Sequence, residues 1–424
     1  MAGVYGSAYV TIAATHSQDC QAGIFATRAS SATLYRVWPL APGQNPVEVD
    51  VLRDGEIYAR RGLRPEVSTP PLQKRGWALQ EHVLSRRVIQ YAEWELRWQC
   101  RTGRATESQP TLIKSTRRSG DKVRQLEPAF LPQRGMDEVD KATVLLLGNL
   151  WADIVKEYSQ RKLAHGSDKL YAVLGVADAL SRSGMGPYHA GVFERDLLMG
   201  LTWYSKRHCP EDSKWRPTHE RPKTYRAPSW SWASIDGKIA WLLKDRSEFY
   251  ESVGQPAHCK VVRMSDTELV LRGKVIPGAL TGHSTCLPRN HEDNAGNVTD
   301  TMAGYTSRGG VSELQLAHSG VDSELFTHTD IVDTTLMHPG IDPPFGLPKL
   351  PLDVICLLLG ARDIPLYSPE VIARYGNKRG LPMSCVLVLT RSSASPGAYE
   401  RVGINSHFFS SSFEGAEELE VTIV

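Results

Sequence analysis

The segment Trp77-Ala78-Leu79-Gln80-Glu81 places an indole four residues before a carboxylate. On a helix, side chains at this spacing share one face. A carboxylate held beside an indole could act in acid–base chemistry or bind a sugar hydroxyl. The alternative is a surface Glu81 next to a buried Trp77, and the residues by themselves favour this structural interpretation.

A second segment, Ala227–Ser234, holds two tryptophans, Trp230 and Trp232, with one residue between them. On a strand, alternate side chains point to the same face, so the two indoles would form a stacking surface. The alternative is a large apolar plug at a domain junction, because each ring can bury roughly 150–250 Å². We prefer the plug, which is the more frequent use of such a pair.

The common cofactor and catalytic motifs do not occur in the sequence. It has no Gly-x-x-x-x-Gly-Lys-Ser/Thr phosphate loop, no Gly-x-Gly-x-x-Gly turn, no His-Glu-x-x-His and no Gly-x-Ser-x-Gly. The seven cysteines form no Cys-x-x-Cys pair, so they indicate neither a zinc site nor a redox site. We therefore predict no metal and no cofactor.

Charge and hydropathy narrow the classes of partner. The 49 basic and 47 acidic residues leave a net charge of +2, too small to attract nucleic acid or an anionic membrane through a global field. Apolar stretches such as Val354–Leu359 are far shorter than the roughly 20 residues of a membrane-spanning helix. The first residues lack a signal-peptide pattern, and we expect reduced thiols in a cytoplasmic protein.

Hydrophobic spacing predicts the elements that would position these residues. A helix should begin at Arg75–Glu81, followed by strands at 88–91 and 95–100. The apolar residues from Leu147 to Tyr158 repeat at helical spacing. Ser167-Asp168 would cap a second helix.

A third helix is expected over about 189–207, with one apolar stripe. Further along, alternating residues predict strands, which we place at 268–276, 353–359, 384–390, 399–404 and 419–424. The polar residues 281–346 are long for a structureless loop, so we interpret them as a largely disordered insertion. Residues 101–139 should form a partly disordered surface loop.

Together these segments resemble the heterokaryon-incompatibility (HET) family of filamentous fungi. The matching segments in chain order are Val4–Ala14 with Gly23–Phe25, Arg75–Val88, Trp98-x-Cys100, Asp168–Gly175 and Pro228–Ser234. The family motif residues among them are Trp77, Gln80, Arg87, Trp98, Asp168, Tyr171, Trp230 and Trp232. The order and spacing of these pieces over about 230 residues make the resemblance specific, whereas Tyr399–Gly403 matches more loosely.

The resemblance departs from the family at the beginning of the chain. Family members carry upstream strands with the patterns Leu-Ser-Tyr-x-Trp-Gly and Trp-Ile-Asp-x-x-Cys-Ile-x-Gln, and neither pattern occurs here. Met1 lies where the family has an internal methionine. We therefore expect an N-terminally truncated member whose remaining strands have unpaired edges, so that the first hundred residues fold poorly.

What the resemblance implies for the fold is an α+β chain in three parts. Residues 1–115 would be the C-terminal half of an α/β HET domain, similar to Toll/interleukin-receptor (TIR) domains. Residues 140–210 would be a helical segment. Residues 225–424 would be a β-rich domain with the insertion at about 281–346.

For function, the resemblance implies non-self recognition and the signalling of programmed cell death. In the reading that we favour, the chain is an interaction module that assembles with itself or with an incompatibility partner, and Glu81 is structural. Some TIR domains, however, cleave NAD with a Glu in a Trp-Cys-x-x-Glu helix. Trp77 and Glu81 have a similar spacing, although Ala78 departs from that pattern, so Glu81 would be catalytic in a nucleotide hydrolase. The third alternative is an inactive truncated paralogue.

Overall fold

The fold is given by a computed structural model with two compact units, one of residues 1–133 and 161–179, the other of 134–160 and 180–424. This division runs through the expected helical segment 140–210 and does not follow its ends. The residues that the structure describes are 2–25, 35–36, 49–53, 56–59, 69–93, 95–100, 102–107, 110–111, 139–205, 222, 224–241, 258–284, 311–316, 325–329, 352–364, 381–409 and 413–424.

The first unit is built on a four-stranded sheet of order β1-β5-β6-β7, in which β1 runs parallel to β5 and the other neighbours are antiparallel. Its elements are α1 (Ala2–Ser7), β1 (Thr11–Ala13), η1 (Pro71–Lys74), α2 (Gly76–Leu84), β5 (Arg87–Tyr91), β6 (Leu96–Cys100), β7 (Arg104–Thr106), η2 (Gly166–Lys169) and α5 (Tyr171–Leu180). A separate three-stranded sheet has the order β2-β4-β3, formed by β2 (Tyr35–Arg36), β3 (Val49–Arg53) and β4 (Glu56–Ala59).

Helix α2 owes its position to a buried apolar face. Ala78, Leu79, Val83 and Leu84 are all buried, and Leu79 and Val83, four residues apart, share one face of the helix. Strand β5 follows after a single connecting turn, and its burial alternates along the strand as expected for period 2. The predicted helix and the two strands after it are confirmed.

The second unit begins with helix α4 (Lys141–Tyr158), which confirms the predicted helical repeat. Asp140 caps it, because its Oδ1 accepts a hydrogen bond from the Thr143 amide at 2.7 Å. The short elements that follow are η3 (Ser181–Met185), β8 (Tyr188–His189), β9 (Val192–Phe193), η4 (Glu194–Asp196), α6 (Leu197–Gly200), β10 (Trp203–Ser205), η5 (Trp232–Ser234) and β11 (Ile239–Trp241).

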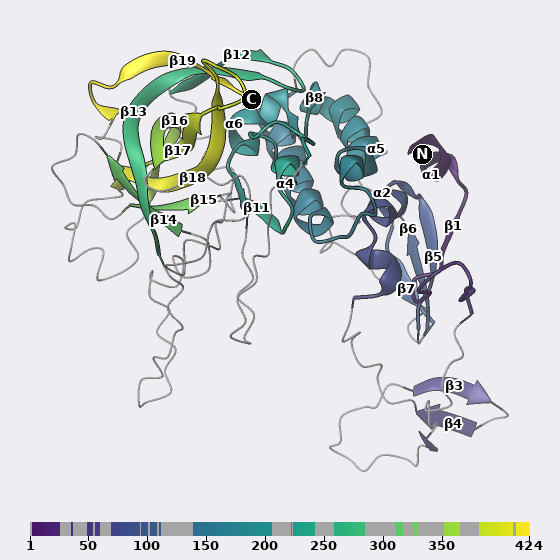
Figure 1. The fold of residues 1–424 in the computed structure, drawn as a ribbon. Coiled ribbons are helices and arrows are strands. Elements are labelled where there is room, and N and C mark those ends of the chain that lie inside the picture. Colours follow the sequence, from purple (N-terminus) through teal and green to yellow (C-terminus); the bar gives the residue numbers. More distant parts are fainter. Residues whose placement is uncertain are drawn as a thin grey trace, which may run out of the picture. The chain divides into compact units, whose positions relative to one another are not determined.

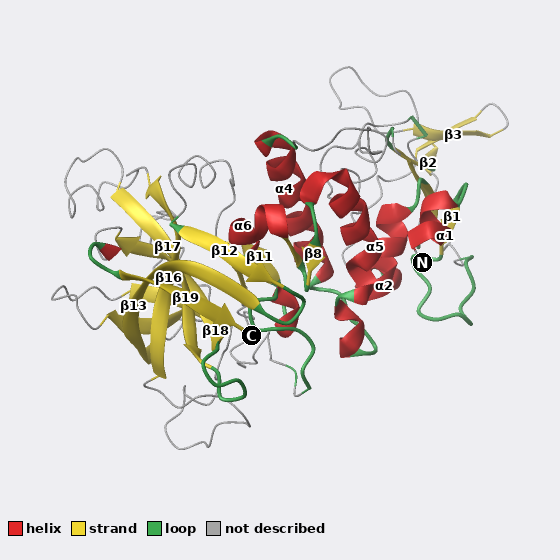
Figure 2. Ribbon diagram, turned by 90° about the horizontal axis from the view of Figure 1, so that it is seen from above, coloured by secondary structure: helices red, strands yellow, loops and turns green. Residues whose placement is uncertain are grey.

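The rest of the second unit is an eight-stranded sheet that closes on itself (Figures 1 and 2). Its order is β12-β13-β14-β15-β18-β17-β16, and closure arises because β13 also pairs with β16. Strand β19 pairs with β13 and, at one position, with β18. The strands are β12 (Cys259–Met264), β13 (Leu269–Ser284), β14 (Val311–Leu316), β15 (Leu325–Thr329), β16 (Leu352–Ile364), β17 (Leu381–Arg391), β18 (Tyr399–Phe409) and β19 (Glu417–Ile423).

One face of this sheet is filled by a single apolar cluster. The members come from β16, β17, β18 and the segment before β19, and they are Val354, Cys356, Leu358, Val386, Val388, Val402 and Phe413. The residues between them, such as Leu357, Leu387 and Leu389, are fully buried as well. Strands β16 and β17 are therefore covered on both faces, which explains why they read as continuous apolar runs.

One expectation needs correction. The third helix over 189–207 is wrong, because Ala190 and Gly191 have positive φ angles of 41° and 107° and turn the chain into the β8–β9 hairpin. The segment expected as a largely disordered insertion, 281–346, contains β14 and β15, and the segment expected as a partly disordered loop, 101–139, contains β7. The remainder of both segments lies largely outside the described residues.

Candidate functional site

Helix α2 is anchored at its first residue. The amide of Gly76 donates to the Lys162 carbonyl at 2.7 Å, and the Lys162 amide donates to the Lys74 carbonyl at 2.6 Å. A Cβ on Gly76 would lie 2.4 Å from Cδ2 of Leu163, so only glycine allows this approach. The segment at 162–163 thus fixes where the helix that carries Trp77 and Glu81 begins.

Two side chains of α2 bind the segment that contains η2 and α5. Trp77 Nε1 donates to Asp168 Oδ2 at 3.1 Å, and the Gly175 amide donates to Gln80 Oε1 at 2.8 Å. Gln80 is only 2% exposed, so its hydrogen bond satisfies a buried polar group. Asp168 was expected to cap a helix. In the structure it lies inside η2, and its carboxylate accepts the hydrogen bond from the Trp77 indole.

The Glu81 carboxylate is half-buried and faces helix α1. Tyr5 is the α1 residue that interacts with it. Burial is the largest cause that raises the pKa of Tyr5, and the charge and hydrogen bond of Glu81 raise it further. The backbone of Glu81 is also held, because its carbonyl accepts from Ser85 Oγ at 2.6 Å. Ser85 Oγ lies 2.7 Å from Thr11 Oγ1 and so joins α2 to β1.

The other motif residues of the first unit lie apart from this group. Arg87 donates to the Tyr9 carbonyl at 3.3 Å and lies over the Tyr9 ring at 4.7 Å from its centroid. Trp98 lies on β6 opposite Ile89 of β5. Its side chain is one of the groups that lower the pKa of the Cys100 thiol. Tyr171 is 64% exposed at the start of α5.

Trp230 and Trp232 belong to the second unit and are both fully buried. They do not lie on a strand, which corrects the expectation of two rings on one strand face. Trp232 opens η5, and the Ser231 hydroxyl caps this turn by accepting from the Ala233 amide at 3.0 Å. The described rings form part of the interior, in keeping with the plug interpretation.

The surroundings of Trp232 are aromatic. Its Nε1 donates to the Gly191 carbonyl at 2.7 Å, and Trp151 Nε1 donates to the same carbonyl at 2.9 Å. The Trp232 ring makes edge contacts with Trp151 and Tyr158, with centroid separations of 6.4 and 6.0 Å. Because both Trp230 and Trp232 are fully buried, neither ring has an exposed face on which a ligand could stack.

A buried arginine beside this segment was missed by sequence reasoning. Arg401 on β18 is 0% exposed; it donates to the Leu201 carbonyl at 2.7 Å and to the Trp203 carbonyl, and its guanidinium lies 3.7 Å from the Trp203 ring centroid. Its amide donates to Ser229 Oγ at 2.8 Å. Partners some 200 residues away leave no local signal, so only its position in an alternating apolar strand could have suggested burial.

The predicted site residues therefore fall into separate groups. Trp77, Gln80, Glu81 and Asp168 come together around α2, whereas Trp230 and Trp232 lie in the other unit. Among the described residues, no three His, Cys, Asp or Glu side chains gather in a way that could hold a metal ion. Nor is any helix in the described ranges long and apolar enough to cross a membrane.

Comparisons with known proteins add no relative. No family model, no curated protein and no solved structure matches this chain.

Proposed function

We propose that this chain is a HET-family interaction module that signals programmed cell death in fungal non-self recognition, acting in the cytoplasm with other proteins. The supporting observation is that α2 and the 168–175 segment, which carry separate parts of the resemblance, bind each other directly. Trp77 bonds to Asp168 across 91 residues of sequence, and Gln80 bonds to Gly175 across 95. If these motif residues stabilise the domain, members of the family can have them in common even when they have no catalytic activity in common.

The proposed fold of the first unit is a remnant of a TIR-like α/β domain. The parallel pair β1–β5, with α2 leading into β5, supports this assignment. Parallel neighbours of this kind need a crossover connection, which is the basic unit of α/β folds.

Glu81 has a structural role in this proposal. Its carboxylate interacts with Tyr5 and so connects α2 to α1. The alternative, an NAD hydrolase, draws on one observation: the Glu81 side chain is only half-buried and lies on the same helix as Trp77. A carboxylate in this position could still reach a ribose or stabilise a developing ribosyl cation.

Expression of the full chain in a filamentous fungal host, from an inducible promoter, separates these functions. Cell death is measured by dye uptake, and cellular NAD is measured at the same times. Trp77→Phe removes the bond to Asp168 and is expected to reduce death, because it weakens the domain. Glu81→Gln keeps an acceptor for Tyr5 and should leave death unchanged, with NAD constant until viability is lost.

Tyr171→Ala changes an exposed motif residue and is the matched control for Trp77→Phe. If Glu81→Gln preserves both NAD and viability while the unchanged chain consumes NAD, the hydrolase replaces the interaction module. If the unchanged chain accumulates in the cells without any loss of viability, the proposal is wrong and the inactive paralogue remains.

A further inference from the structure

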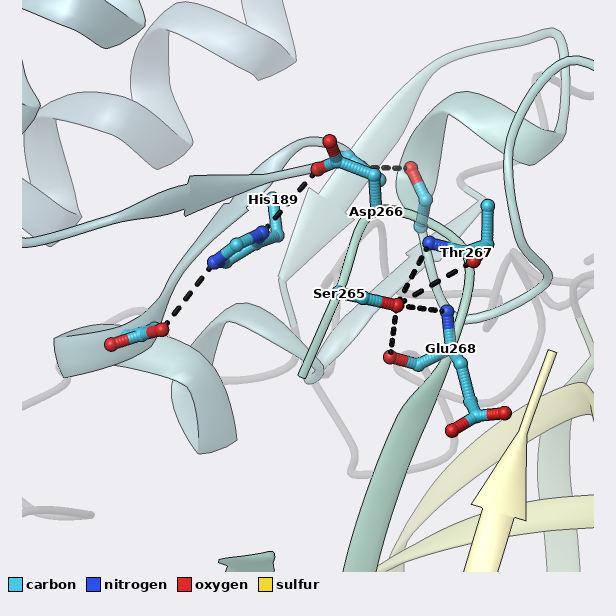
Figure 3. Close-up of polar contacts among 8 residues, drawn as sticks. His189, Ser265, Asp266, Thr267 and Glu268 are labelled. Atoms are coloured by element: carbon cyan, nitrogen blue, oxygen red, sulfur yellow. Dashed lines mark hydrogen bonds and ion pairs between the residues drawn. The ribbon is translucent and has the colours of Figure 1, made fainter. Parts of the chain in front are cut away.

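His189 lies between two carboxylates that come from different elements of the second unit. Its Nε2 is 3.3 Å from Glu194 Oε1 at the start of η4, and its Nδ1 is 3.4 Å from Asp266 Oδ1 in the turn between β12 and β13. Figure 3 shows the imidazole of His189 pointing toward Asp266. The His189 side chain is 22% exposed, so the ring is held within the structure, while Asp266 is 77% exposed.

The chemistry of imidazole makes this arrangement depend on a proton. A neutral ring carries one N–H and one acceptor nitrogen, so it can donate to only one of the two carboxylates. The remaining carboxylate would then face a lone pair. The imidazolium has an N–H on each nitrogen and attracts both oxygens, so the geometry is complete only when His189 is charged.

We propose that His189, Glu194 and Asp266 form a proton-dependent clasp that fastens the β12–β13 turn to the β8–β9 hairpin. When the ring carries both protons, the imidazolium bridges both carboxylates and the clasp is closed. As the pH rises and the ring loses its proton, one bridge is lost and the turn is released.

The two parts that the clasp joins are each well ordered. On one side, Ser265 Oγ accepts from the Glu268 amide at 3.0 Å and donates to the Glu268 carbonyl at 3.2 Å, which fixes the turn that presents Asp266 (Figure 3). On the other side, the Gly191 carbonyl of the hairpin accepts from Trp151 and Trp232. The clasp therefore connects a surface turn to the aromatic interior of the unit.

Three other titratable groups lie around the clasp: Tyr188, Arg195 and Arg263. Burial raises the pKa of Tyr188, with further increases from Tyr158 and Asp266, so this hydroxyl stays neutral. Arg195 on η4 donates to the Gly184 carbonyl at 2.8 Å. Arg263 on β12 pairs with Glu268 across the same turn. Histidine is the residue type whose charge changes between about pH 5 and 8.

Hydrogen–deuterium exchange of the full chain, at about pH 5.5 and about pH 8 and corrected for intrinsic rates, tests the clasp. Peptides that cover the turn at 264–269 should be protected about two- to five-fold more at the lower pH, because two partly exposed ion pairs each contribute modestly. His189→Gln and Asp266→Asn should each abolish this difference. Asp266 is largely exposed, so Asp266→Asn reports on the clasp even if His189→Gln impairs folding.

His165→Gln is the matched control, since His165 is an exposed histidine in the first unit. It should leave the pH difference in the turn unchanged. Equal protection of the turn at both pH values in the unchanged chain, or a pH difference that survives Asp266→Asn, would overturn the proposal.

Discussion

Gly191 has little room for a side chain in the interior of the second unit. Its φ of 107° is unfavourable for residues with a Cβ, and a Cβ there would lie 2.6 Å from Trp232 Nε1. Gly191→Ala should therefore lower the free energy of unfolding by about 2 kcal/mol or more, through backbone strain and a displaced indole. Denaturant unfolding followed by tryptophan fluorescence measures this loss.

A substitution at Gly397 distinguishes backbone strain from crowding against Trp232 as the cause of this loss of stability. Its φ is 86°, but nothing lies within 4 Å of a Cβ built on it. Gly397→Ala should cost only about 1–2 kcal/mol, the contribution of the backbone alone. A loss as large as that of Gly191→Ala would show that crowding against Trp232 contributes little.

The thiol of Cys100 should be more reactive than the buried thiols of Cys259 and Cys356. Burial raises its pKa, but hydrogen bonds from Thr102, Gly103 and Trp98 outweigh burial and lower the pKa of the thiol overall. In contrast, burial raises the pKa of Cys259 and Cys356 to about 12. Because the thiolate is the nucleophile, iodoacetamide at neutral pH should modify Cys100 about tenfold faster or more than either of them.

Mass spectrometry of individual peptides measures these alkylation rates. Thr102→Ala removes the hydroxyl that lies 3.1 Å from the Cys100 sulfur and should slow modification of Cys100 at neutral pH. Equal rates for Cys100 and Cys356 in the folded chain would refute the assignment.

At the residue scale, the sequence predicts the secondary structure of the motif residues but not which residues they contact. The segment with Trp77, Gln80 and Glu81 is correctly predicted as a helix, yet its partners Asp168 and Gly175 lie over 90 residues away. Hydrophobic periodicity cannot predict these contacts, because they depend on how the two segments pack against each other in the folded unit. Arg401 was missed for the same reason.

At the scale of elements, strand β1 is a short edge strand of the first unit's four-stranded sheet. It has three residues, pairs only with β5 among the described strands, and leaves Ile12 58% exposed. Elements with few buried contacts open with low free energies. The amide of Ile12 should therefore exchange at least about tenfold faster than that of Val88 on β5, which is 1% exposed.

Hydrogen exchange resolved to single residues checks this order. Protection of Ile12 equal to that of Val88 would contradict both this prediction and the expectation that the first hundred residues fold poorly. Ser85→Ala provides a second test, since it removes the hydroxyl that lies 2.7 Å from Thr11 Oγ1 and should accelerate exchange in β1.

Elements with a long, regular pattern could be predicted, and short elements set by unusual backbone angles could not. Helix α4 presents its apolar residues at one spacing over 18 residues. The segment 189–207 has a similar stripe, but the positive φ angles at Ala190 and Gly191 form a hairpin there, and η4, α6 and β10 follow as short elements. Alanine carries no sequence signal for a φ of 41°, because this conformation is imposed by the surrounding contacts.

At the scale of the whole molecule, the two compact units should respond independently to changes in either core. Arg401 is the residue that tests this, because its contacts join β18 to Leu201 and Trp203 within the second unit. Arg401→Leu leaves two carbonyls without this donor and removes the stacking on Trp203. It should lower the stability of the second unit by about 3 kcal/mol or more.

Arg401→Lys distinguishes the loss of geometry from the loss of charge. Lysine keeps the positive charge but lacks the planar fork that binds two carbonyls and stacks on an indole, so it should recover only a small part of the stability. Hydrogen exchange measured in low denaturant should show faster opening throughout β16, β17 and β18, with β5 and β6 unchanged. Equal acceleration in β5 and β6 would mean that the chain unfolds as one cooperative body, and the division into two independent units would then be wrong.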